Sequence, residues 1–314
     1  MTAFGDFLNL ALSSLTPILI AALFSRYAER SGATNIAIDG TMLLSAFAAL
    51  AVAYGTGNAW LGLVAAISAG MLCAAFLALF ALGLQCNLII AGIAFNMLAT
   101  GLSYLLLRSI FDAAGNFSPI DVSLLPRVDI GTLSSVLVIG GMLKNQSILV
   151  YLVLALVVGQ MVLLDRSAFA VRVRAVGDTE DAAAAVGIRV WLVRTVALVV
   201  SGAGAGVAGA YLSLSSVGSF NPFLTGGLGF IAFSAVIFGR ATSPGIILAA
   251  VLFATFSALV IVLQGTGVLN QQLLQALPYA TTIAALALHG AINRRRDRFE
   301  TTDTSSMPVI VPRG

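Results

Sequence analysis

Polar side chains within long apolar stretches are the residues of this chain that could handle a small solute. Asn35, Asp39 and Asn96 lie at or inside apolar segments, where an unpaired amide or carboxylate facing lipid would be costly. These groups therefore either hydrogen-bond neighbouring helices or line a water-filled path. Phe230 and Phe233 could stack on a base or a sugar ring, or they could fill the protein interior. We take the five as candidates for a solute path.

The residue patterns of several enzyme classes are absent from the sequence. The one lysine, Lys144, does not belong to a Gly-x-x-x-x-Gly-Lys-Ser/Thr loop, so the chain lacks this means of ATP hydrolysis. It also has no His-Glu-x-x-His pair and no Gly-x-Ser-x-Gly elbow. Cys73, Cys86 and the single histidine, His289, do not form a metal-ligand pattern. We expect no catalytic residue, no metal and no other cofactor.

The segment 165–194 carries the pattern of a short capped helix. Asp178 can accept the free N–H groups of a first turn, and Glu180 suits the positive end of the helix dipole. Ala182–Ala185 favour helix, and Gly187 can supply a left-handed stop. A helix of about two turns is not stable alone. We therefore expect it to dock in a groove of another subunit.

The composition indicates that the segments holding these residues lie in a lipid bilayer. Apolar residues make up 59% of the chain and charged residues 9%, and the mean hydropathy is +1.02. Gly40–Leu107 and Ala241–Asn293 contain no Asp, Glu, Lys or Arg, and each exceeds the about 20 residues of one bilayer crossing. The apolar stretches are continuous and not alternating, which favours helices over a barrel. We predict an all-α, polytopic membrane protein with a single transmembrane domain, residues 1–293.

Hydropathy predicts about nine transmembrane helices, within a range of eight to ten. The predicted spans are Phe7–Phe24, Ile36–Tyr54, Trp60–Gly83, Leu88–Leu107, Ser147–Leu164, Leu192–Leu214, Leu228–Gly239, Pro244–Gln264 and Leu273–Leu288. The seventh has about a dozen residues, a length typical of a re-entrant or broken helix. A full crossing and a partial one both remain open for it.

Arginines mark the connections that stay in the cytoplasm. They cluster after the first, fifth, seventh and ninth predicted spans, at 26–30, 166–194, 240 and 294–298. Nine spans place all four clusters on one side, with the N-terminus outside and the C-terminus cytoplasmic. The segment 108–146 is then an external loop, and 294–314 is a basic and then disordered cytoplasmic tail. Orientation explains the net charge of +3, so no nucleic-acid partner is expected.

Several stretches, in order, resemble the permeases of ATP-binding-cassette (ABC) importers for branched-chain amino acids, ribose and other simple sugars, and nucleosides. The closest likeness is to the nucleoside and simple-sugar branch. The matching stretches are 31–40, 87–101, 174–188, 229–240 and 274–279. Two departures are mild: Asp39 stands where the family pattern has Glu, and Thr34 stands where an aliphatic residue is usual.

The resemblance implies a non-catalytic permease subunit in a bacterial cytoplasmic (inner) membrane. Its implied partners are an ATP-binding subunit, a second identical or paralogous permease, and an extracellular or periplasmic solute-binding protein. The residues implied to couple to the ATP-binding subunit are Arg174, Gly177, Asp178, Glu180, Ala182, Ala183 and Gly187. The implied solute is a nucleoside or a related small molecule. Simple sugars and branched-chain amino acids are alternatives within the class, and an ion-coupled carrier or channel is the alternative outside it.

Overall fold

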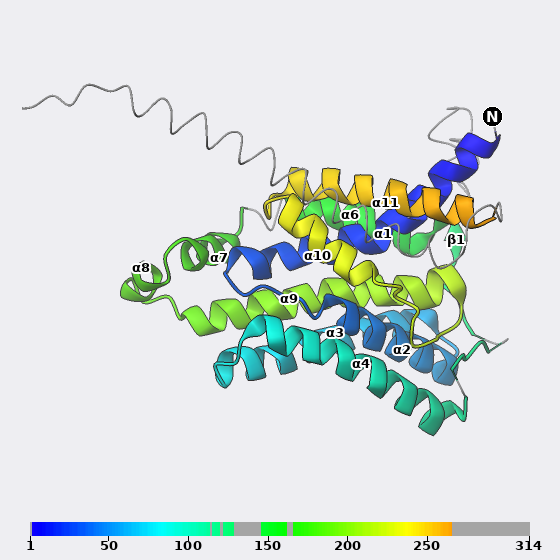
Figure 1. Ribbon diagram of the computed structural model, residues 1–314, viewed down its shortest axis with the longest axis horizontal. Coiled ribbons are helices and arrows are strands. Elements are labelled where there is room, and N and C mark those ends of the chain that lie inside the picture. The colour runs from blue at the N-terminus through cyan, green and yellow to red at the C-terminus, as the bar shows by residue number, and fades with distance from the viewer. Residues whose placement is uncertain (1, 114, 120–121, 129–145, 162–165, 266–314) are drawn as a thin grey trace, which may run out of the picture.

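The computed structural model describes residues 2–113, 115–119, 122–128, 146–161 and 166–265, which form a helical bundle (Figure 1). The longer helices are α1 (Thr2–Arg30), α2 (Ile38–Thr56), α3 (Ala59–Ala78), α4 (Leu88–Phe111), α9 (Val190–Ala210) and α11 (Ser243–Gly265). The shorter ones are α6 (Ile148–Gly159), α7 (Ala168–Asp178), α8 (Glu180–Ala185) and α10 (Leu228–Phe238). Two π-helical segments, η1 (Leu79–Gly83) and η4 (Tyr211–Val217), continue α3 and α9.

Six helices in the described part of the chain are long and apolar enough to cross a membrane. They are α1, α2, α3 with η1, α4, α9 with η4, and α11, which agree with six of the predicted spans. The other three differ. Ser147–Leu164 contains the 12-residue α6, Leu228–Gly239 contains the 11-residue α10, and Leu273–Leu288 lies outside the described residues. The predicted count of nine is thus not confirmed.

One small sheet departs from the all-α prediction. Strands β1 (Arg127–Val128) and β2 (Gln146–Ser147) pair antiparallel, with Arg127 opposite Ser147. Both belong to the predicted external loop or border it. The loop also begins later than expected, because α4 continues to Phe111 and ends on Asp112 in the left-handed conformation. The whole predicted tail, 294–314, and residues 129–145 of the loop lie outside the described residues.

Helix α9 runs through the centre of the bundle and contacts α1, α2 and α3 at glycines. A side chain at Gly202 would overlap the backbone of Gly70 on α3, and one at Gly204 would overlap Phe24 on α1. One at Gly209 would overlap the Met42 carbonyl on α2. Small residues allow the helix backbones to approach closely, which dispersion forces then stabilise without any hydrophobic drive from lipid.

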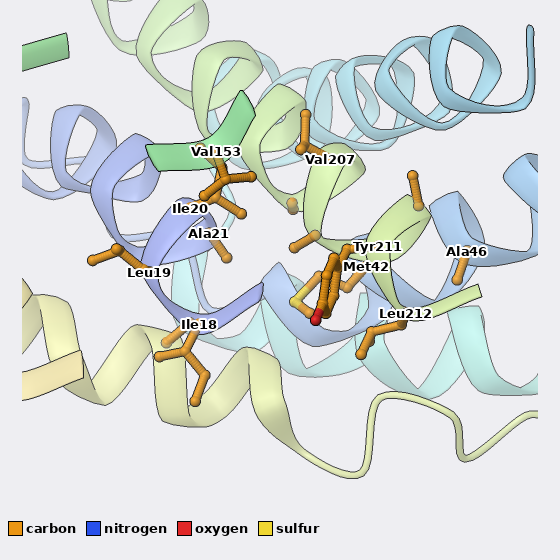
Figure 2. Close-up of a cluster of buried hydrophobic side chains, with 14 of the residues drawn as sticks. Ile18, Leu19, Ile20, Ala21, Met42, Ala46, Val153, Val207, Tyr211 and Leu212 are labelled. Carbon is orange, nitrogen blue, oxygen red and sulfur yellow. The ribbon is translucent and has the colours of Figure 1, made fainter. Parts of the chain in front are cut away.

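The bundle interior is filled by apolar side chains from helices far apart in the sequence. Figure 2 shows Ile18 and Ile20 of α1, Met42 of α2, Val207 of α9 and Tyr211 of η4, which belong to one buried cluster. All five are buried. Such close packing resists any volume change, so these side chains fix the spacing of the helices that carry the polar residues.

The two ends of the bundle carry different connections. Helices α7 and α8 lie at the end opposite the N-terminus (Figure 1). The C-terminal turn of α1 lies there too, and the Arg26 guanidinium donates to Ser243, three residues after Arg240. Three of the four arginine clusters therefore meet at one end, as predicted, and the fourth, 294–298, lies outside the described residues. At the other end Ser123 donates to the Gly57 carbonyl (2.6 Å).

Candidate functional site

Helix α10 begins inside the bundle, after a non-helical segment. Residues 218–227 follow η4, and the backbone of Phe220 pairs with that of Phe117 through two 2.9 Å hydrogen bonds. Gly226 and Gly227 have φ of 52° and 83°, so they turn the chain where other residues would be strained. The 11 residues of α10 then extend about 17 Å, roughly half of a hydrocarbon core. Irregular backbone within a membrane is tolerated where it lines a cavity.

A cavity of about 820 Å³ lies against this broken segment. Its walls come from α1, α2, α4, η4, residues 222–227, α10 and α11. Aromatic surface is supplied by Phe223, Phe230 and Tyr211. The polar side chains on its wall are Ser13, Ser14, Asp39, Thr100, Tyr211, Ser216, Thr225 and Ser257. The cavity thus combines hydroxyl groups with aromatic faces, which suits a polar solute that has an unsaturated ring.

Asp39, in the first turn of α2, binds the start of α10. One carboxylate oxygen accepts a hydrogen bond from the Gly229 N–H (3.0 Å), and the other accepts one from the Thr225 hydroxyl (3.1 Å). The N-cap of α10 is Gly227, which has no side chain to cap the helix. Asp39 therefore satisfies a first-turn N–H from another helix, and its charge suits the positive end of the dipole.

The other candidates for the solute path separate into lining and packing residues. Phe230 lines the cavity with 38% of its surface exposed, whereas Phe233 packs against the core and is absent from the described lining. Asn35 is buried outside that lining. Its amide donates to the Ser201 hydroxyl (2.8 Å) and accepts from the Ala37 N–H (3.0 Å).

Asn96 joins α4 to the start of α2. Its side-chain oxygen accepts from the Gly40 N–H (2.8 Å), and its side-chain nitrogen donates to the Ile36 carbonyl (2.9 Å). Both ends of the amide are thus engaged by backbone, and Asn96 is not among the described lining residues. Of the five candidates for the path, the structure brings Asp39 and Phe230 together at the cavity.

Sequence reasoning missed most of the polar lining. Ser13 and Ser14 on α1, Ser216 on η4 and Ser257 on α11 were not singled out. Single hydroxyls in apolar helices are common, since they can bond the carbonyl four residues back, as Ser13 does to Asn9 (3.0 Å). The sequence held one signal for this lining. Ser13 and Pro17 are four residues apart and so share a helix face, and both line the cavity.

The segment after α6 forms two helices where one was predicted. Helix α7 starts after Ser167, whose hydroxyl accepts from the Ala170 N–H (3.2 Å), and it continues through Asp178. Thr179 is extended and precedes α8 without a side-chain cap. The prediction that Asp178 caps the short helix is therefore wrong, because α7 has already enclosed that residue. The predicted stop is correct: Gly187 has φ 84°.

Helix α8 ends in a Schellman motif and docks through one alanine. Gly187 N–H donates to the Ala184 carbonyl (3.0 Å) and Ile188 N–H to the Ala183 carbonyl (3.1 Å), the paired bonds of this motif. Ala183 is buried in a cluster with Tyr27, whereas Ala182 on the same helix is exposed. Helix α8 thus has one side on the bundle and one side available to a partner.

Two further contacts hold α7 and α8 to the bundle. Arg194 on α9 forms a 2.9 Å ion pair with Glu180 and donates to the Ser31 carbonyl (3.0 Å). On α7, a side chain at Gly177 would overlap the carbonyl oxygen of Arg30. Arg174 is exposed on α7.

A protein-family comparison assigns the chain. The family described as branched-chain amino acid transport system / permease component matches residues 7–286, most of the chain. The chain belongs to this permease family. The permease is accordingly a subunit of an ABC transporter, as its sequence motifs indicate.

Three relatives match nearly the whole permease. A Haloferax volcanii protein named "Putative glucose ABC transporter permease protein" is 30% identical, over 91% of this chain and 92% of its own. The nucleoside ABC transporter permease protein NupC of Lactococcus lactis is 27% identical, over 87% and 88%. The guanosine ABC transporter permease protein NupQ of Bacillus subtilis is 30% identical, over 88% and 89%. The permease is thus similar to transporters of nucleosides and of a sugar.

Proposed function

We propose that this permease carries nucleosides through the cavity at the start of α10, as the membrane subunit of an ABC importer. The observation that carries the proposal is the cavity itself: a broken helix, hydroxyl groups and the Phe223 and Phe230 rings converge on a volume of about 820 Å³. A nucleoside has a planar base for the rings and ribose hydroxyls for the polar groups. The relatives named for nucleosides support the same solute.

The unit formed by α7 and α8 docks the ATP-binding subunit in this proposal. The exposed face of α8 presents Ala182 and Val186, with Val186 77% exposed, which suits insertion into a groove. The arginines at this end suit the cytoplasmic side. With nine crossings, the six long helices together with Ser147–Leu164, Leu228–Gly239 and Leu273–Leu288, the N-terminus lies outside and the C-terminus in the cytoplasm. The membrane is the bacterial cytoplasmic membrane.

Contacts from α7 to α1 and from α1 to α11 give a route for force from this unit to the cavity. The ring of Phe169 on α7 lies 5.8 Å from that of Tyr27, and the adjacent Arg26 donates to Ser243 at the start of α11. Helix α11 packs on α10, whose first turn borders the cavity. Closure of two ATP-binding subunits would move α7 and α8 and switch the access of the path enclosed by two permeases. An extracellular or periplasmic binding protein delivers the solute.

Uptake into proteoliposomes tests the function. The permease is reconstituted with its ATP-binding subunit and binding protein, and the uptake of labelled uridine, guanosine, glucose and leucine is measured with and without ATP. We expect ATP-dependent uptake of the nucleosides that also requires the binding protein. Uptake of glucose alone would favour the second candidate, a simple sugar, which the Haloferax relative supports. Uptake driven by an ion gradient without ATP would contradict the importer class.

A further inference from the structure

The described wall of the cavity carries an acidic side chain and no basic one. Among the lining residues that the structure describes, Asp39 carries the only ionisable acid or base apart from the Tyr211 phenol, and there is no lysine, arginine or histidine. An anionic solute would therefore meet a carboxylate on the wall and no cation among the described lining residues. Because charge interactions are strong away from water, the Asp39 carboxylate repels an anionic solute in the cavity.

The position of the Asp39 carboxylate matters as much as its charge. The first-turn N–H groups of a helix are a natural site for phosphate or carboxylate. At α10 the Asp39 oxygens accept from the Gly229 N–H and the Thr225 hydroxyl, at 3.0 and 3.1 Å. A side chain at Gly229 would overlap the Asp39 backbone, so α2 and α10 touch here without space for an anion between them. The protein's own carboxylate occupies the place that a solute anion would take.

We infer that Asp39 determines charge selectivity: it fills the anion position at the start of α10 and so restricts the path to uncharged or cationic solutes. This inference rests on the proposed function and deepens it by defining the solute class. Nucleosides and free sugars satisfy it, whereas nucleotides and sugar phosphates are rejected. The selectivity acts within the membrane subunit and adds to that of the binding protein.

Asp39→Asn tests the inference with little change in shape. Its side-chain oxygen can still accept from Gly229, while the charge is lost. Thr225→Val is the matched control, since it removes the second hydrogen bond and leaves the carboxylate charged. The complete importer in nanodiscs is titrated with inorganic phosphate, and the thermal unfolding midpoint reports binding. The Asn side chain still fills the position at the start of α10, so the comparison isolates the charge. We expect Asp39→Asn to bind phosphate on the cavity wall at least about tenfold more tightly than the wild type and Thr225→Val, because a nearby like charge is removed. Equal phosphate affinity in all three proteins would overturn the inference.

A wild-type measurement keeps the inference falsifiable if Asp39→Asn does not assemble. Uridine and uridine 5′-monophosphate differ only in the phosphate group, and each is titrated into the wild-type importer. We expect no stabilisation by the monophosphate, and stabilisation equal to or above that by uridine would overturn the inference. The phosphate titration contains no nucleoside, so its result does not depend on which solute the importer carries. An importer found to carry sugars would thus refute the nucleoside proposal while the role of Asp39 stands or falls on its own data.

Discussion

The α-carbon of Gly177 on α7 lies directly against the backbone carbonyl of Arg30, the last residue of α1. No side chain fits between the two backbones, so the contact holds α7 at a fixed distance from the end of a membrane-spanning helix. The sequence motif placed Gly177 in the segment that couples to the ATP-binding subunit. The structure gives the glycine a packing reason, since any larger residue must displace α7.

We predict that Gly177→Val separates α7 from α1 and abolishes most ATP-dependent uptake while the chain still inserts. Overpacking of this kind costs about 1–3 kcal/mol of stability. Thermal unfolding of the purified permease and uptake in proteoliposomes measure the two effects. Gly101→Ala is the control, because a methyl group there meets no atom within 4 Å. Normal uptake by Gly177→Val would show that the position of α7 does not matter for transport.

Local hydropathy was enough to predict six of the membrane helices, because a continuous apolar run of about 20 residues has few other stable solutions. The break before α10 was harder to predict: the short apolar run Leu228–Gly239 indicated a broken helix but left a full crossing open, and Gly226-Gly227 is the other signal. The role of Asp39 was out of reach, because its partners Thr225 and Gly229 are 186 and 190 residues away in sequence. Asp178 failed as a cap because an earlier helix start, Ser167, has its own capping hydroxyl.

Ala182 and Ala183 on α8 form a matched pair for separating docking on the bundle from docking on a partner. Ala183 is 3% exposed within the cluster around Tyr27, whereas Ala182 is exposed. We expect Ala183→Leu to lower the thermal midpoint of the isolated permease by overpacking. Ala182→Leu should leave that midpoint unchanged and weaken binding of the ATP-binding subunit, as measured by copurification. Equal effects of the two substitutions in both assays would contradict this division of α8 into two faces.

Asn96→Leu tests whether this amide packs α4 on α2 or contacts the solute. The substitution leaves the Gly40 N–H and the Ile36 carbonyl without their partners, so we expect a loss of about 1–3 kcal/mol per unpaired group. Met97→Leu is the control, because Met97 is 74% exposed on the next position. Uptake by the folded fraction should keep the wild-type KM. A raised KM with unchanged unfolding would instead place Asn96 in the solute path.

The role of the cavity as the transport path is tested by labelling one engineered thiol. Ser216→Cys, a small change on the cavity wall, is made in a background in which Cys73 and Cys86 are replaced by Ala and Ser. Ser109→Cys serves as the control, on the exposed face of α4 and outside the described lining. We predict that a hydrophilic thiol reagent abolishes nucleoside uptake by Ser216→Cys, that transported nucleoside slows this labelling, and that labelled Ser109→Cys keeps its uptake. Full labelling of Ser216→Cys with uptake at the unlabelled rate would contradict passage through this cavity.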